Sequence, residues 1–122
     1  MKSEERLFIL GDSGIKKTWK TKRLWLLSSD LEVFDFKVDT FEAIDEDCWF
    51  GDRNKPTVRN VIKHAKKIME ADLSYPIILN ENGIIMDGIH RVCRAHMDGL
   101  KTVKAVKFSK DPMPDFEEEY KI

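Results

Sequence analysis

The spacing of hydrophobic residues changes several times along the chain, which predicts a mixture of helices and strands. Helical spacing predicts three helices, over residues 18–31, 57–72 and 89–98. Alternation of apolar and polar residues predicts strands over 34–39 and 102–108, the first with one buried face. The intermixed helices and strands predict an α+β (mixed α/β) fold, in which a small mixed sheet packs with helices in a compact single domain.

Turn residues predict a β-hairpin between the second and third helices. The apolar runs 75–79 and 84–86 are separated by Asn80-Glu81-Asn82-Gly83, and Asn-Gly is the strongest short hairpin signal. The second arm ends abruptly at Asp87-Gly88, and Gly99 stops the third helix in the usual left-handed position.

The predicted second helix carries three kinds of side chain on different faces. Its apolar face is Val58, Val61, Ile62, Ala65, Ile68 and Met69. A strongly basic face contains Lys63, Lys66 and Lys67, and a third, polar stripe contains Thr57, Asn60 and His64.

The chain has the length of one domain. It contains 122 residues, 42% hydrophobic and 35% charged, and domains most often have roughly 100–150 residues. Residues 18–110 are predicted to form the domain, and 57–108 is its best-supported part. The segment 1–17 is expected to be mobile or loosely packed, and 111–122 to be a solvated acidic tail.

Charge and composition exclude several classes of protein. Lys and Arg number 21 and Asp and Glu 22, so the net charge is −1 and a globally basic nucleic-acid-binding protein is not expected. No apolar run approaches the roughly 18–20 residues of a membrane span, and the first residues do not resemble a signal peptide. For this reason no membrane partner is expected. Cys48 and Cys93 form no CxxC motif, which favours a reducing, cytoplasmic location.

The chemistry is concentrated in Asp87-Gly88-Ile89-His90-Arg91, where a strand gives way to a helix. A helix N-terminus offers backbone N–H donors and partial positive charge, Gly88 permits close approach, and His90 and Arg91 add donors. Together these features predict a site for an anion such as phosphate. Asp87 then caps the helix, orients His90 or Arg91, or holds a cation. A purely structural alternative has Asp87 as cap, Gly88 as turn residue and Arg91 paired with a surface acid.

This segment resembles the ParB/sulfiredoxin-like superfamily. The resemblance rests on DGIHR at 87–91, the PIIL strand and hairpin before it, and RA…G…V.AV.F after it, and it covers 57–108. It implies a compact mixed α/β fold with a nucleotide-phosphate pocket at the helix that begins near Gly88. The activities of the family include ATP-dependent sulfinic-acid reduction, CTP-gated DNA clamping, phosphorylation of free serine and nuclease activity.

Departures from the family patterns favour some of these activities over others. Ile89 stands where sulfiredoxins have a reactive cysteine, so their chemistry is not expected. Partition proteins have Glu-Arg-Arg where this chain has Ile89-His90-Arg91. The Asp-Gly-His-His-Arg motif of the free-serine kinases is the closest to the string found here.

The resemblance implies roles for individual residues. Asp87, His90 and Arg91 are the predicted catalytic residues, and Asp87 is also the predicted Mg²⁺ ligand. The residues predicted to contact the nucleotide are Gly88, Ile89, His90, Arg91, Thr57, Asn60 and His64. We therefore expect a domain that binds ATP or another nucleotide with Mg²⁺, either as a small-molecule phosphotransferase or as an ATPase, with an unidentified small-molecule or protein partner.

Two alternatives remain open, and with them the question of enzymatic activity. One is a non-enzymatic regulatory or partner-binding module, of the antitoxin or immunity type, that retains the fold. The other is a nuclease or nucleic-acid-binding protein that uses the Lys63-Lys66-Lys67 face. Trp49 and Phe50 either stack on a nucleobase or belong to the core. The acids between 42 and 47 either supply a general base or Mg²⁺ ligand, or form a solvated loop.

Overall fold

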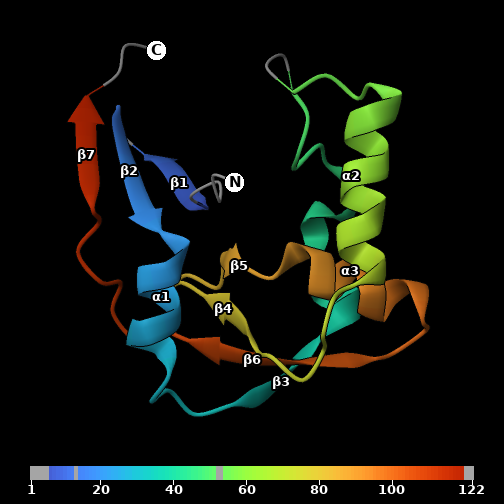
Figure 1. The fold of residues 1–122 in the computed structure, drawn as a ribbon. Helices are drawn as coiled ribbons and strands as arrows, with labels where there is room; N and C mark the ends of the chain where they lie inside the picture. Colours follow the sequence, from blue (N-terminus) through green and yellow to red (C-terminus); the bar gives the residue numbers. More distant parts are fainter. Residues whose placement is uncertain (1–5, 13, 52–53, 120–122) are drawn as a thin grey trace. The chain divides into compact units, whose positions relative to one another are not determined.

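The computed structural model describes residues 6–12, 14–51 and 54–119, and it has the predicted α+β class (Figure 1). Three α-helices and seven strands are present in the described residues. Their order is β1 (Leu7–Asp12), β2 (Ile15–Lys20), α1 (Thr21–Ser28), β3 (Phe34–Lys37), the 3-10 turns η1 (Val38–Thr40) and η2 (Glu42–Asp45), α2 (Val58–Met69), β4 (Ile77–Leu79), β5 (Ile85–Asp87), α3 (Ile89–Met97), β6 (Thr102–Lys107) and β7 (Phe116–Glu119).

The strands form two sheets. The three-stranded sheet has the order β1-β2-β7 and is antiparallel throughout, whereas the four-stranded sheet has the order β3-β6-β4-β5. β4 and β5 form the predicted hairpin, with Ile78 opposite Asp87. The Asn80 side chain holds its turn, because its carboxamide oxygen accepts hydrogen bonds from the backbone nitrogens of Asn82 and Ile84, each at 2.9 Å.

The chain divides into two compact units, each of which is described by itself. The first unit comprises Met1–Glu32, Ile78–Asp87 and Val106–Ile122, and the second comprises Val33–Ile77 and Gly88–Ala105. Among the helices in the described part of the chain, none is both long enough and apolar enough to cross a lipid bilayer.

The core of the first unit surrounds Trp19. Its indole nitrogen donates to the Pro112 carbonyl at 2.9 Å, and its ring centroid lies 5.8 Å from that of Phe8. The buried residues of this cluster are Trp19, Leu24, Ile78, Met86, Val106 and Phe108, with Phe8, Leu10 and Leu31 packed against them. The core thus combines the start of the chain, the hairpin and the end of the chain.

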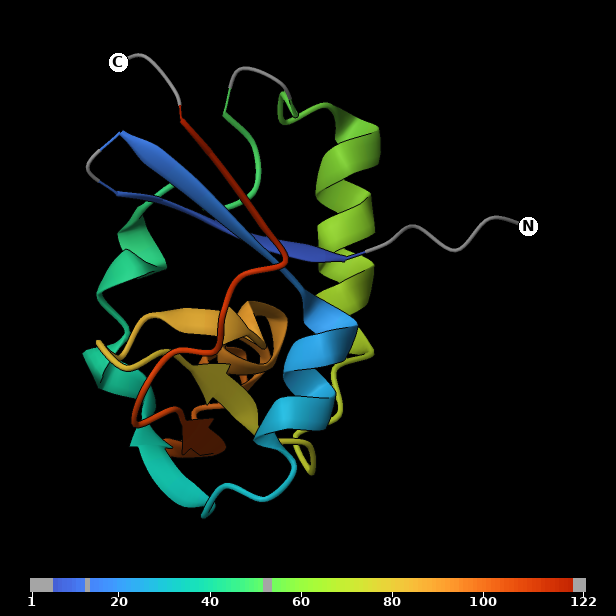
Figure 2. The same cartoon turned by 90° about the vertical axis from the view of Figure 1, so that its left-hand side faces the viewer.

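The two ends of the chain contain strands that the sequence pattern did not predict, and every residue of the C-terminal strand is exposed. The segment 1–17 contains β1 and the start of β2, which pair in register with Phe8 opposite Trp19. The tail 111–122 contains β7, which pairs with β2 so that Phe116 lies opposite Thr18 (Figure 2). Both segments are held because β2 has a strand on each side. Residues 1–5, 13 and 120–122 of these segments lie outside the described residues.

The helix predicted over 18–31 is shorter in the structure. Residues 18–20 belong to β2, and α1 spans only Thr21–Ser28. Asp115 accounts for this boundary, since its carboxylate accepts from the backbone nitrogen of Lys20 at 2.8 Å. A contact between residues so distant in sequence is invisible to local helical periodicity.

In the second unit, α2 and α3 pack together and β3 pairs with β6. Val92 and Ala95 of α3 are fully buried, as are Ile77 and Ala105. β3 differs from the predicted strand with one buried face, because Phe34 is 40% exposed and every other residue of the strand is exposed or half-buried. The buried residue of this segment is Val38, which begins η1.

The orientation of α2 also differs from the usual arrangement of an amphipathic helix, in which the apolar face packs on the core. No residue of α2 is buried. Val58 is 77% exposed, Ile62 61% and Met69 57%, and Asn60 and His64 are on the half-buried side. The apolar face found in the sequence is therefore turned outward.

Candidate functional site

The turn that leads into α3 has the left-handed backbone conformation that a glycine at position 88 predicts. Gly88 has φ 110° and ψ 17°, in the left-handed region, and its carbonyl accepts from the nitrogens of Arg91 and Val92 at 3.0 and 3.1 Å. A Cβ at this position would lie 2.5 Å from Cγ2 of Ile77. The glycine is thus required by conformation and by the close approach of Ile77.

His90, on the first turn of α3, meets His64 from the middle of α2. Nε2 of His90 and Nδ1 of His64 are 2.9 Å apart, so one ring nitrogen donates to the other. The two rings are nearly parallel, at 11°. The structure thus brings together two residues that are separated by 26 positions in sequence and were both predicted to contact a nucleotide.

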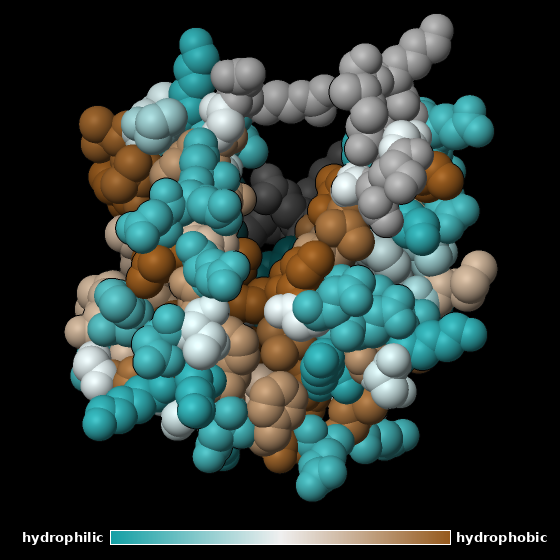
Figure 3. Space-filling view, turned by 180° about the vertical axis from the view of Figure 1, so that it is seen from behind, coloured by the Kyte–Doolittle hydropathy of each residue, from teal (hydrophilic) through white to brown (hydrophobic). Residues whose placement is uncertain are grey.

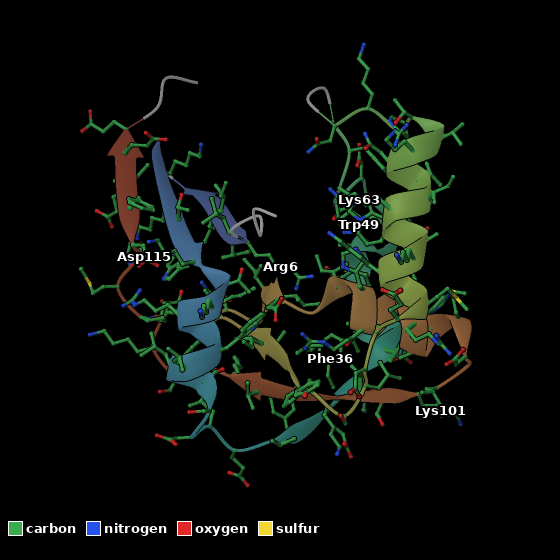
Figure 4. The ribbon with its side chains drawn as sticks, viewed as in Figure 1. Arg6, Phe36, Trp49, Lys63, Lys101 and Asp115 are labelled. Atoms are coloured by element: carbon green, nitrogen blue, oxygen red, sulfur yellow. The ribbon has the colours of Figure 1, made fainter. Side chains whose placement is uncertain are left out.

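The indole of Trp49 lies over this pair of imidazoles. Its centroid is 4.5 Å from that of His64 and 4.9 Å from that of His90, with interplanar angles of 12° and 3°. Phe50 meets the His64 ring edge-on at 5.5 Å. Figure 4 shows Trp49 beside α2, near Lys63. We call His64, His90 and Trp49 the imidazole–indole stack.

Asp47 fixes the loop that carries Trp49. Its carboxylate accepts from the backbone nitrogens of Phe50 at 2.8 Å and Gly51 at 2.7 Å. These hydrogen bonds, that of Gly51 first, lower the pKa of Asp47 below its ordinary value. One of the acids that sequence analysis weighed as a general base or Mg²⁺ ligand is therefore engaged in holding this loop.

The surroundings of His64 favour its neutral form. Burial lowers the pKa of His64, and the positive charges of Lys67 and Lys63 lower it further. A neutral imidazole has one donor and one acceptor nitrogen, as the contact with His90 requires. The same two lysines contribute positive charge beside His64, which favours an anionic ligand there.

Arg91 and Asp87 make structural contacts. Nη1 of Arg91 donates to the Pro76 carbonyl at 2.6 Å and to that of Tyr75 at 3.5 Å, which ties α3 to the segment before β4. In the first unit, the Asp87 carboxylate accepts from the indole nitrogen of Trp25 at 2.8 Å. The catalytic roles predicted for these two residues remain predictions.

Thr57 and Asn60 organise the start of α2. The Thr57 hydroxyl accepts from the Asn60 backbone nitrogen at 3.2 Å, the usual contact of an N-cap. The Asn60 carboxamide donates to the Lys55 carbonyl at 2.8 Å. Of the predicted polar stripe, His64 is the member in contact with His90, and Ile89 is half-buried at the start of α3.

For Trp49 the sequence left two roles open, stacking on a nucleobase and a position in the core, and the structure places its ring against His64 and His90. Its signal was the aromatic pair after the acidic run 45–47, which fits a core position equally well. Cys93 lies one turn after His90, and burial raises the pKa of its thiol, which favours the protonated form. Among the residues that the structure describes, no group of three or more His, Cys, Asp or Glu side chains is placed to hold a metal ion.

Comparisons with protein-family models, with curated proteins and with solved structures found no match to this chain. The functional assignment therefore rests on the residues and their geometry.

Proposed function

We propose that the second unit binds a phosphate-bearing ligand, a nucleotide, at the imidazole–indole stack. The observation that carries this proposal is the meeting of His64 and His90 at the first turn of α3, with the Trp49 ring parallel to both. The resemblance of 57–108 to ParB/sulfiredoxin-like proteins supports the same class of ligand.

The phosphate would be held by three kinds of positive group. The first turn of α3 presents backbone N–H donors and the positive end of the helix dipole. The imidazoles add donors once the hydrogen bond between them opens. Lys63 and Lys67, which already act electrostatically on His64, complete the positive environment.

Trp49 would receive the base. Its half-buried indole already stacks on two flat rings, and a nucleobase offers a third flat surface of the same kind. Trp49 belongs to a loop held by Asp47 rather than to a helix or strand, so a small adjustment of that loop can open a space for the base.

We propose binding, rather than phosphoryl transfer, as the activity of this site. Arg91, the residue predicted to neutralise charge during transfer, donates to two backbone carbonyls. A site that binds the nucleotide through the histidines and lysines leaves these two hydrogen bonds of Arg91 intact. The function is then that of a nucleotide-responsive regulatory module, and measured turnover of ATP would instead favour the catalytic roles predicted for Asp87, His90 and Arg91.

The experiment is a titration of the intact chain with ATP, CTP, ADP and inorganic phosphate, followed by calorimetry. His90→Phe keeps a flat ring beside Trp49 but removes both ring nitrogens, so we expect it to weaken nucleotide binding more than tenfold. His96→Phe is the matched control, because His96 is exposed on the last turn of the same helix. Equal affinity in the two variants, or no binding by the native chain at millimolar nucleotide, would contradict the proposal.

A further inference from the structure

The outward face of α2 is an apolar surface on a helix whose other side is already packed. Val58, Ile62, Ala65 and Met69 are all exposed, and Val61 beside them is 47% exposed. In Figure 3, which views the molecule from behind, strongly hydrophobic atoms are visible at the upper left, on the side of the view where α2 lies. Burying apolar side chains away from water is favourable, so a row of them on the exposed side of one helix is typical of an interaction surface.

The spacing of this row is that of a helix that packs against another helix. Positions 58, 62, 65 and 69 are separated by steps of four, three and four, which is the repeat of the seam between two coiled helices. We call these four residues the α2 seam. Their spacing keeps them in line along the helix, where a second helix can follow them.

The charges beside the α2 seam are of one sign. Arg59 and Lys66 each follow a seam residue by one position, where side chains flank the contact between paired helices. Lys63 lies further round the same side, and residues 58–69 contain no Asp or Glu. The acid that follows α2, Glu70, forms an exposed ion pair with Lys66 at 3.9 Å, and Arg59 has no such acid four residues further along the helix. The side chains of Arg59, Lys63 and Lys66 are all exposed.

This charge distribution decides which kind of helix fits. In an antiparallel pair of two copies, Arg59 and Lys66 would face their own counterparts, and like charges so placed are unfavourable. In a parallel pair they would face Val61 and Ile68 and gain no opposite charge. A helix with acidic residues beside its own apolar row would bury the α2 seam and would also place opposite charges near Arg59 and Lys66.

We propose that the α2 seam is a docking surface for an amphipathic helix of a partner protein, with acidic residues flanking the partner's apolar row. The seam lies on the side of α2 away from His64, so docking leaves the imidazole–indole stack in place. The interaction is therefore separate from the proposed nucleotide site.

The test uses a designed helical peptide with leucine in the seam positions and glutamate beside them. A second peptide has the same leucines with lysine in place of every glutamate. Fluorescence anisotropy of each labelled peptide with the intact protein should show binding of the acidic peptide, weakened by salt, and at least tenfold weaker binding of the basic one. Equal binding of both peptides, or binding of neither, overturns the proposal.

Variants of the chain locate the binding. Ile62→Asp should abolish binding of the acidic peptide and Lys66→Glu should weaken it at least tenfold. Both positions are exposed, and Lys66→Glu removes only an exposed ion pair with Glu70, so we expect circular dichroism to show the native fold in both variants. Lys101→Glu is the matched control, an exposed lysine away from α2 (Figure 4). Unchanged binding in Ile62→Asp contradicts the assignment to this face.

Two other occupants give different results. Sedimentation that shows a dimer of the native chain, lost in Ile62→Asp, assigns the α2 seam to a second copy and overturns the proposal. Binding to vesicles that contain phosphatidylserine, lost in the same variant and without binding of the acidic peptide, assigns it to a lipid surface and overturns it also. Nucleotide titration of Ile62→Asp stays unchanged, so failure of this proposal and failure of the nucleotide proposal are distinguishable.

Discussion

His64 binds a proton less readily in the folded protein than in the unfolded chain. Burial is the main reason its pKa is lowered, and Lys67 and Lys63 contribute. Stability from this group is therefore fully present above the ordinary histidine pKa of about 6.5 and is lost as the pH falls through the lower folded value. Urea unfolding at a series of pH values should show this decline. Replacement of His64 by Phe should flatten it, whereas a profile unchanged by the substitution would contradict this account.

The same residue predicts how nucleotide binding depends on pH. A bound phosphate favours a charged imidazole, so it opposes the effects that lower the pKa of His64. The affinity for ATP should accordingly increase as the pH is lowered from 8 towards 6, as long as the protein remains folded. Calorimetry in buffers of different ionisation enthalpy would detect the uptake of the proton. An affinity that is constant or decreases over this range would argue against a role for His64.

At Gly88, the backbone conformation and the close approach of Ile77 both disfavour any residue other than glycine. Gly88→Ala combines a positive φ with a Cβ 2.5 Å from Ile77, so we expect a loss of stability of roughly 2 kcal/mol or more. Gly99→Ala is the control, since Gly99 has φ 70° but no atom within 4 Å of an added Cβ. Thermal unfolding should place Gly88→Ala well below Gly99→Ala. Equal destabilisation would mean that the approach of Ile77 contributes nothing.

Individual contacts of the site were only partly predictable. The Asp-Gly string before the third helix predicted that His90 belongs to the site. The spacing of Thr57, Asn60 and His64 identified the side of α2 that faces His90. The contact of Trp49 with both imidazoles depends on how a long loop returns to α2. Local periodicity carries no information about such a return, because it reports only neighbours in sequence.

Among the elements, α3 is connected to the segment before β4 by Arg91. Arg91→Ala would leave the carbonyls of Pro76 and Tyr75 without this donor, and we expect a loss of about 1–3 kcal/mol. Arg59→Ala removes an exposed arginine from α2 and should change stability by less than about 0.5 kcal/mol. Chemical unfolding of both variants measures the difference. If Arg91→Ala were as stable as the native chain, the hydrogen bonds of Arg91 to Pro76 and Tyr75 would not contribute to stability.

The helices and the hairpin were predicted more accurately than the orientation of α2. The Asn82-Gly83 turn and the Gly99 stop are strong local signals, and β4, β5 and α3 lie within a residue or two of the predicted bounds. The side of α2 that faces inward is set by contacts of His64 with His90 and of Asn60 with the Lys55 carbonyl. The contact with His90 is a tertiary contact, which the local sequence pattern does not reveal. A large apolar face predicts that a helix packs on something, and does not specify whether that is the same chain.

At the scale of the whole chain, the end of the sequence is part of the first unit rather than a detached tail. Removal of residues 111–122 would take away β7, the acceptor of the buried Trp19 indole and the Asp115 carboxylate on Lys20. We expect a loss of roughly 2 kcal/mol or more. Glu118→Ala breaks a surface ion pair with Lys16 and should cost about 0–1 kcal/mol. Native-like unfolding of the truncated chain would contradict this role.

The fold class could be predicted from the sequence, but the assembly of its ends could not. β7 is short, and its pairing with β2 joins residues about a hundred positions apart, whereas β1 pairs with the strand that follows it in sequence. The alternation of Phe8 and Leu10 with Leu7 and Ile9 makes every position of β1 from 7 to 10 apolar. That run lacks the alternation of apolar and polar residues that marks a strand with one solvent-exposed face, so the pattern did not predict a strand there.

The central claim is that His64 and His90 receive a phosphate at the start of α3. The most direct measurement is the ¹⁵N chemical shift of the imidazole nitrogens of the intact chain during titration with ATP. We predict large, saturable shifts at His64 and His90, with His96 unaffected, and loss of the His64 response in His90→Phe. Unchanged imidazole shifts at saturating or millimolar ATP would contradict the claim.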